Sequence, residues 1–172
     1  MSEPRRVVDT RQGPIALRPE RPDDDAFLLR LFDAARGSVL RLGGVPEPMV
    51  EQLVAMQHRA QTQTYRGTFP RAVFSIIEHE SVPIGRIVEN EEPDAVHVVD
   101  IALLPQFQAK GIGTALVRAL QADWAARGCG ARAQVAFDNA PSLKLFRRLG
   151  FVEIDPDERP YLRLRWSRPA PV

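Results

Sequence analysis

The sequence predicts one mixed α/β domain, and three observations lead to this class. The chain has 172 residues, the size of an ordinary domain that buries its own core. Hydrophobic residues make up 44% of it and charged residues 26%, both near the average of globular proteins. Short apolar runs alternate along the chain with segments of helical periodicity, which is typical of mixed α/β domains and unlike helical bundles or sandwiches.

The composition argues against several other classes of protein. No run approaches the roughly 18 apolar residues of a membrane span, and the first nine residues are too charged for a signal peptide. We therefore expect a cytoplasmic protein without a membrane partner. With one cysteine, Cys129, and no cysteine or histidine cluster, we expect neither an internal disulfide nor a metal site. The net charge of +1 makes nucleic acid a poor candidate partner.

Residues 14–166 are expected to form the folded domain, between a flexible arm at 1–13 and a flexible tail at 167–172. Ile15–Arg18 is predicted to be a brief strand. Pro22 and the three aspartates after it predict a helix start, because proline suits the first turn and acids suit the positive end of the dipole. That helix should end near Ala35, before a second helix near Glu47–Gln61.

The middle of the chain is predicted to form strands. Ala72–Ile77 and Ile84–Val88 are rich in β-branched residues, which favours an antiparallel pair. Val96–Leu104 is apolar at nearly every position, as expected of a central strand covered on both faces, and Pro105 ends it.

The last third of the domain begins with the clearest helix of the sequence. After Gly111, apolar residues recur every four positions as far as Trp124, and Gly128 ends the helix. The remaining predicted elements are a strand at Ala131–Phe137, a helix at Ala140–Leu149, and a closing pair of strands at Phe151–Ile154 and Tyr161–Trp166.

The loop Gln108–Thr114, with the sequence QAKGIGT, lies between the central strand and this helix. Its two glycines would let the backbone approach a ligand, and the helix N-terminus suits a phosphate group. The same glycines would also serve a simple tight turn. A Walker A loop does not fit because Lys110 precedes the glycines, and a Rossmann fingerprint does not fit because Leu116 stands at the third small residue.

The spacing Gln108-x-x-Gly111-x-Gly113 resembles the Gln/Arg-x-x-Gly-x-Gly/Ala pattern of the GNAT superfamily of N-acetyltransferases. The resemblance extends in order and length over residues 15–166. Its other parts are Leu17-Arg18-Pro19, the lead-in Ile101-Ala102-Leu103-Leu104-Pro105, and Asn139 followed by Ser142 and Gly150-Phe151.

The resemblance implies an acyl-CoA N-acyltransferase fold, with a central bulged mixed sheet flanked by helices. It also implies acetyl-CoA as co-substrate, an unidentified amine as acceptor, direct attack of that amine, and dimerisation as a property common in the family. The residues implied to bind the cofactor are Ile101, Ala102, Leu103, Gln108, Ala109, Lys110, Gly111, Ile112, Gly113, Thr114, Asn139 and Ser142.

Bases in this family commonly project from the central strand, where the sequence offers His97 and Asp100. In a regular strand these two residues point to opposite faces, but a bulge would change that parity. Either side chain is also explained as an ordinary polar residue at the end of a sheet. Glu89 is a weaker candidate.

The tyrosine that protonates the leaving thiolate in many family members matches Phe146 here, which the apolar helical face of Leu145, Phe146 and Leu149 assigns to the core. Water, Ser142, the displaced amine proton and Tyr161 remain as sources of this proton. This departure motivates an alternative, a non-catalytic domain that binds or senses acyl-CoA. A nucleotide-binding module is a more remote alternative, and Cys129 is expected to be a buried structural thiol.

Overall fold

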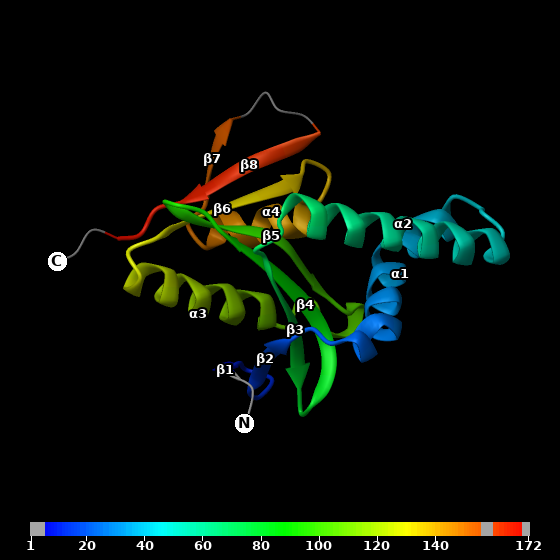
Figure 1. The fold of residues 1–172 in the computed structure, drawn as a ribbon, viewed down its shortest axis with the longest axis horizontal. Coiled ribbons are helices and arrows are strands. Elements are labelled where there is room, and N and C mark those ends of the chain that lie inside the picture. Colours follow the sequence, from blue (N-terminus) through cyan, green and yellow to red (C-terminus); the bar gives the residue numbers. More distant parts are fainter. Residues whose placement is uncertain (1–5, 156–159, 170–172) are drawn as a thin grey trace.

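The structure, a computed structural model, describes residues 6–155 and 160–169. An eight-stranded sheet runs through these residues in the spatial order β1-β2-β3-β4-β5-β6-β8-β7 (Figure 1). The strands are β1 (Arg6–Val8), β2 (Ile15–Pro19), β3 (Val73–His79), β4 (Val82–Glu91), β5 (Ala95–Leu103), β6 (Gly130–Ala136), β7 (Val152–Asp155) and β8 (Tyr161–Trp166). The helices are α1 (Asp25–Leu42), α2 (Glu47–Thr68), α3 (Ile112–Ala126) and α4 (Ala140–Arg148), with short 3-10 turns at Pro22–Asp24 and Pro105–Phe107.

Neighbouring strands are antiparallel except for β5 and β6, which are parallel and are connected through α3. This confirms the mixed α/β class that the sequence predicts and the mixed sheet flanked by helices that the family resemblance implies. The predicted antiparallel pairs are present as β3 with β4 and as β7 with β8. The predicted central strand is β5, which has four strands on one side and three on the other.

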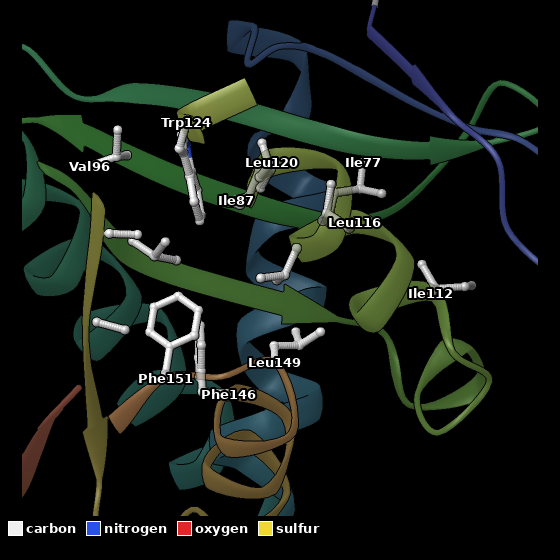
Figure 2. Close-up of a cluster of buried hydrophobic side chains, with 14 of the residues drawn as sticks. Ile77, Ile87, Val96, Ile112, Leu116, Leu120, Trp124, Phe146, Leu149 and Phe151 are labelled. Carbon is white, nitrogen blue, oxygen red and sulfur yellow. The ribbon is translucent and has the colours of Figure 1, made fainter. Parts of the chain in front are cut away.

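The larger cluster of buried apolar side chains joins α3 and α4 to one face of the sheet. The four-residue repeat places Ile112, Leu116, Leu120 and Trp124 on one side of α3, and each is at most 1% exposed. Figure 2 shows these side chains and Phe146 of α4 within one cluster beside the strands of the sheet. The face of the sheet that packs on α3 is therefore covered by apolar side chains.

The smaller cluster joins α1 to the opposite face of the sheet, so that α1 and α2 lie on the other side from α3 (Figure 1). Phe27, Leu28 and Leu31 of α1 pack on Ile76 of β3, and Ala102 of β5 borders the cluster. This face of β5 consequently looks toward the two N-terminal helices.

A buried ion-pair network anchors the start of α1 to the sheet. The Arg18 guanidinium donates to carboxylates of Asp24 and Glu78 at 2.7 Å, and all three residues are buried. The Asp24 carboxylate also accepts a hydrogen bond from the backbone N–H of Arg21. The aspartates after Pro22 thus lie at the favourable end of the helix dipole, and one of them, Asp24, also neutralises the charge of Arg18.

Part of the expected flexible arm belongs to the sheet. Residues 6–8 form β1, antiparallel to β2, and Arg6 donates to the carbonyl oxygen of Ala119 and pairs with Asp123 at 2.6 Å. These contacts with α3 offset the entropy cost of ordering a short polar segment. No sequence pattern reveals the contacts, so the strand could not be predicted. Residues 1–5 of the expected arm and 170–172 of the expected tail lie outside the described residues.

Both N-terminal helices are longer than the sequence predicts, since α1 continues from Ala35 to Leu42 and α2 from Gln61 to Thr68. Gly37 lies within α1 instead of ending it. A Cβ at Gly37 would meet the Asp33 carboxylate and the Arg41 guanidinium, which form an ion pair across this position at 3.0 Å. The missing side chain therefore leaves room for a contact that supports the helix beyond it.

Within residues 6–155 and 160–169, no helix is long and apolar enough to cross a membrane. The same residues contain no group of three histidine, cysteine or acidic side chains arranged to hold a metal ion.

Candidate functional site

The two parallel strands at the middle of the sheet pair over only part of their length. Residues 95–98 of β5 pair with residues 130–133 of β6, but β5 continues to Leu103 while β6 continues beside β8. Within the described residues, the edge of β5 that faces β6 is therefore unpaired from residue 99 onward. Unpaired strand edges carry free backbone donors and acceptors that can bind an extended ligand.

A bulge in β5 lies at the point where this separation begins. Val88 of β4 is opposite Asp100, but the next residue, Glu89, is opposite Val98, so Val99 is an extra residue. His97 is opposite Asn90. Val88 and Asn90 are two residues apart on β4 and therefore share a face, so their partners Asp100 and His97 share it too. The bulge thus places His97 and Asp100 on one face of the sheet, whereas a regular strand would separate them.

The loop Gln108–Thr114 lies at the far end of this unpaired edge. The Gln108 side-chain amide donates to the carbonyl oxygen of Leu103, the last residue of β5, at 2.7 Å. Gly111 adopts a φ of +83° as the residue that caps α3. The first N–H groups of a helix have no partner within it, so those of α3 are available beside the end of β5.

Gly111 and Gly113 meet different requirements in this loop. Gly111 has a left-handed conformation that favours glycine, and Gly113 lies inside α3 with no such constraint. A Cβ at Gly113 would approach Leu145 to 3.5 Å and Leu103 to 4.0 Å, which are ordinary contacts. A methyl group would therefore fit at Gly113, in contact with Leu103 of β5 and Leu145 of α4.

Asn139 and Ser142 lie at the start of α4, on the same side of the sheet as α3. The Asn139 side chain caps the helix by accepting a hydrogen bond from the backbone N–H of Ser142 at 3.2 Å. At the other end of α4, Arg148 donates to the hydroxyl of Thr114 at 2.6 Å. Arg148, which the sequence analysis missed, thereby adds a positive charge beside the loop.

Asp100 lies in an ion pair that the sequence analysis also missed. Its Oδ2 accepts hydrogen bonds from Nη2 and Nε of Arg86 on β4, at 2.6 and 3.2 Å, and Arg86 Nη2 also donates to Gln61 of α2 at 3.1 Å. The ring of Tyr65, one turn further along α2, lies 5.8 Å from the guanidinium carbon. Burial, with the nearby Asp100 carboxylate, raises the pKa of Tyr65 to about 12, so its phenol is neutral. An arginine inside an apolar strand is the sequence signal that identifies this pair.

His97 lies beneath the end of α2, edge-on to the ring of Phe69, with 5.3 Å between the ring centroids. Its Nδ1 is 3.7 Å from a carboxylate oxygen of Glu92. Burial lowers the pKa of His97 below its usual 6.5, although Glu92 opposes that shift. The imidazole is consequently neutral at pH 7 and able to accept a proton.

Three other residues considered from the sequence, Glu89, Phe146 and Cys129, lie away from this face. Glu89 accepts a hydrogen bond from the indole N–H of Trp124 at 3.1 Å on the α3 side. Phe146 is 2% exposed and packs edge-on against Phe151, which confirms its place in the core. Cys129 is half-buried, not buried as expected, because it lies in the turn between α3 and β6. Tyr161, by contrast, is half exposed at the start of β8 and lies near enough to Tyr65 to contribute to the raised pKa of that phenol.

A cavity of about 790 Å³ lies elsewhere, between α4 and the strands β7 and β8. None of its lining residues is one of the sequence-predicted site residues. They are Phe137, Ala140, Leu143, Lys144, Arg147, Glu153 and Leu162.

Comparison with known proteins agrees with this geometry. Residues 46–151 match the model of the family described as Acetyltransferase (GNAT) family. An N-alpha-acetyltransferase of Sulfurisphaera tokodaii is 28% identical over 150 residues, which cover 73% of this chain and 88% of that protein.

Two solved structures show the same fold at low identity. The PaiA N-acetyltransferase of Thermoplasma acidophilum in complex with coenzyme A has a TM-score of 0.68 and 16% identity, over 89% of this chain and 98% of that one. The ribosomal-protein-S18-alanine N-acetyltransferase of Escherichia coli has a TM-score of 0.60 and 14% identity, over 92% and 96% of the two chains.

Proposed function

Because the chain belongs to the GNAT family of acetyltransferases, we propose that it transfers the acetyl group of acetyl-CoA to an amine at the unpaired edge of β5. One observation carries the proposal. The edge opens after Val98 and ends at Leu103, where the N-terminus of α3 is available for the pyrophosphate. Nothing in the comparisons supports the alternative of a non-catalytic acyl-CoA domain.

The proposed cofactor site uses mainly backbone groups. Residues 101–103 would pair with the pantetheine arm as an added strand would, and residues 108–114 would hold the pyrophosphate through N–H groups. The free N–H groups at the start of α3, beside the end of β5, support this placement. Asn139 and Ser142 would line the other side of the arm.

The proposed chemistry needs a base on the face of β5 that looks toward α2. An acceptor amine with a pKa between about 8, for an α-amino group, and about 10.4, for an alkylamine, is mostly protonated at pH 7, so it must lose a proton before it attacks the thioester. The bulge supports this role for His97 or Asp100, since it places both on that face. A backbone N–H of the unpaired edge would donate to the thioester carbonyl.

The leaving thiolate must be protonated without the usual tyrosine. Phe146 carries no proton to donate and is sealed in the core. A thiol with a pKa near 8.5 is a tolerable leaving group, so water, Ser142, Tyr161 or the proton displaced from the amine would suffice as its proton source.

The acceptor carries an α-amino group in this proposal. The relative from S. tokodaii is an N-alpha-acetyltransferase, and the E. coli structure is of an enzyme that acts on an alanine of a ribosomal protein. Both support an acceptor whose amine is attached to an α-carbon.

The test is to incubate the purified chain with acetyl-CoA and a panel of amines while free thiol is measured. We expect thiol release that depends on the acceptor, with hydrolysis in the absence of acceptor as the control. If coenzyme A binds but no amine, amino acid or peptide N-terminus releases thiol above the control, the transferase proposal is wrong.

A further inference from the structure

The Arg86–Asp100 pair has more hydrogen-bonding capacity than its own contacts use. The side chains are 7% and 21% exposed, so both charges are largely withdrawn from water. Nε and Nη2 of Arg86 both donate to the same oxygen, Oδ2 of Asp100. Within the described part of the chain, Arg86 Nη1 has no acceptor and Asp100 Oδ1 has no donor.

The position of the pair connects it with the acetyl group. Asp100 lies one residue beyond the bulge, in the part of β5 that no longer pairs with β6. Its side chain is on the face that looks toward α2, where Gln61 and Tyr65 contact or adjoin Arg86. An amine that attacks at the start of the unpaired edge would therefore lie beside both members of the pair.

We propose that Arg86 and Asp100 together bind the acceptor as a free α-amino acid, with its amino group on Asp100 Oδ1 and its carboxylate on Arg86 Nη1. This inference rests on the proposed function. An α-amino acid carries its ammonium and carboxylate groups on the same carbon atom, so its two charges lie close together. This spacing matches the Asp100 carboxylate and the Arg86 guanidinium, whose nearest atoms are 2.6 Å apart. Arginine also presents its donors in the planar arrangement that carboxylates accept.

The charge balance of this face distinguishes an amino acid from other amines. A simple alkylamine would place a second cation next to the withdrawn guanidinium, which is unfavourable. A peptide N-terminus or an amino acid amide offers only a neutral carbonyl oxygen to Arg86. Among the neighbouring groups, Arg66 pairs with Glu20 at 2.6 Å and the Tyr65 phenol is neutral, while Arg36 adds a further positive charge that an alkylammonium ion would meet.

The first experiment uses the full chain and three matched acceptors: an L-amino acid chosen from a panel of the twenty, its α-carboxamide, and the corresponding decarboxylated amine. We expect kcat/KM for the amino acid to exceed that for the amide by at least about 10-fold and that for the amine by about 10²-fold. Equal or better acetylation of the amide, the amine or a peptide N-terminus would overturn the inference while leaving the transferase proposal intact.

Two variants test which arginine carries the preference. Arg86→Gln should bring the ratio of amino acid to amide close to one, chiefly through KM for the amino acid. Arg66→Gln removes an arginine from the same face and should leave the ratio unchanged. If Arg86→Gln folds and keeps the wild-type ratio, Arg86 does not bind the carboxylate; if it does not fold, the wild-type ratio alone decides.

Calorimetric titration separates acceptor binding from catalysis. The same three compounds are titrated into the protein loaded with coenzyme A, which cannot transfer an acetyl group. Tighter binding of the amino acid than of its amide supports the inference even if no turnover occurs, and in that case only the transferase proposal fails. Equal binding of all three compounds contradicts the inference.

Discussion

Two glycines separated by one residue have different physical roles in the loop before α3. Gly111 has a φ of +83°, which an L side chain adopts only at a cost of about 1–2 kcal/mol. Gly113 is helical, and a Cβ there would make only ordinary contacts with Leu145 and Leu103. The fold requires the first glycine, and the ligand proposed here requires the second.

Substitution of each glycine separates these roles. Gly113→Val should weaken coenzyme A binding by at least about 10-fold, because a branched side chain would intrude where the backbone is proposed to pass close to the pyrophosphate, with little change in the melting temperature of the free protein. Gly111→Ala should instead lower the free energy of unfolding by about 1 kcal/mol. Calorimetry and thermal melting measure the two effects, and normal coenzyme A binding by the valine variant would show that the loop is only a turn.

The two candidate bases differ in how the rate depends on pH. Burial lowers the pKa of His97 below 6.5, so the imidazole is the proton-accepting form above that pKa. If His97 is the base, the rate rises with pH through a pKa below 6.5 and is level at neutral pH. His97→Gln should then abolish the rise and slow turnover by about 10²- to 10⁴-fold.

Asp100→Asn is the matched variant for this measurement. With His97 as base, it should raise KM for the acceptor and leave the rise at low pH in place. A rise that persists in His97→Gln and disappears in Asp100→Asn would assign the base to Asp100. If both variants turn over at the full rate, the proton goes to water or to a group on another element.

At the scale of elements, the packing of α3 on the sheet includes one carboxyl group. Glu89 accepts a hydrogen bond from Trp124, and burial raises the pKa of Glu89 above its usual 4.5. The folded state therefore holds this proton more tightly than the unfolded chain. The resulting stability is fully present below about pH 4.5 and is lost as the pH rises through the folded-state pKa.

Glu89→Gln keeps an oxygen for Trp124 and removes the titration. The variant should be more stable relative to wild type at pH 7 than at pH 4, and denaturant unfolding at the two pH values measures the difference. Glu91→Gln is the control, because Glu91 is exposed and pairs with Arg127 at the surface. A stability difference between wild type and Glu89→Gln that does not change with pH would contradict the assignment.

The sequence predicts the elements whose pattern is local. The apolar run of β5 and the four-residue repeat of α3 each identify their element without any knowledge of neighbours. Strand β1 is different, because its three residues are ordered by contacts of Arg6 with α3, more than a hundred residues away. The extension of α1 past Gly37 likewise depends on an ion pair that forms only in the helix.

The candidate site divides in the same way. The loop at residues 108–114 is predictable because its chemistry lies in seven consecutive residues. The shared face of His97 and Asp100 depends on one extra residue in β5, and the contact of Asp100 with Arg86 depends on the register of β4. Register is set by pairing across strands, so neither follows from the spacing of residues along the chain.

At the scale of the whole molecule, coenzyme A should stabilise the native state because it binds only there. At a concentration one hundred times its dissociation constant, the expected gain is about 2.7 kcal/mol. Thermal melting with and without millimolar coenzyme A measures it, and adenosine triphosphate serves as the control ligand. An unchanged melting temperature with coenzyme A, or a larger shift with adenosine triphosphate, would contradict the cofactor assignment.

The short parallel ladder also determines how the protein opens. Strands β1 to β5 and strands β6 to β8 are joined through the sheet by the four residue pairs at 95–98 and 130–133. Such a seam is a natural boundary for sub-global unfolding, in which β6 and β8 detach together while β3 and β4 stay paired. Amide hydrogen exchange in the ligand-free protein should therefore be faster in β6 than in β4. A cofactor bound where β5 and β6 separate would hold the two parts of the sheet together. Its binding should therefore slow amide exchange in β6 and β8 more than in β3.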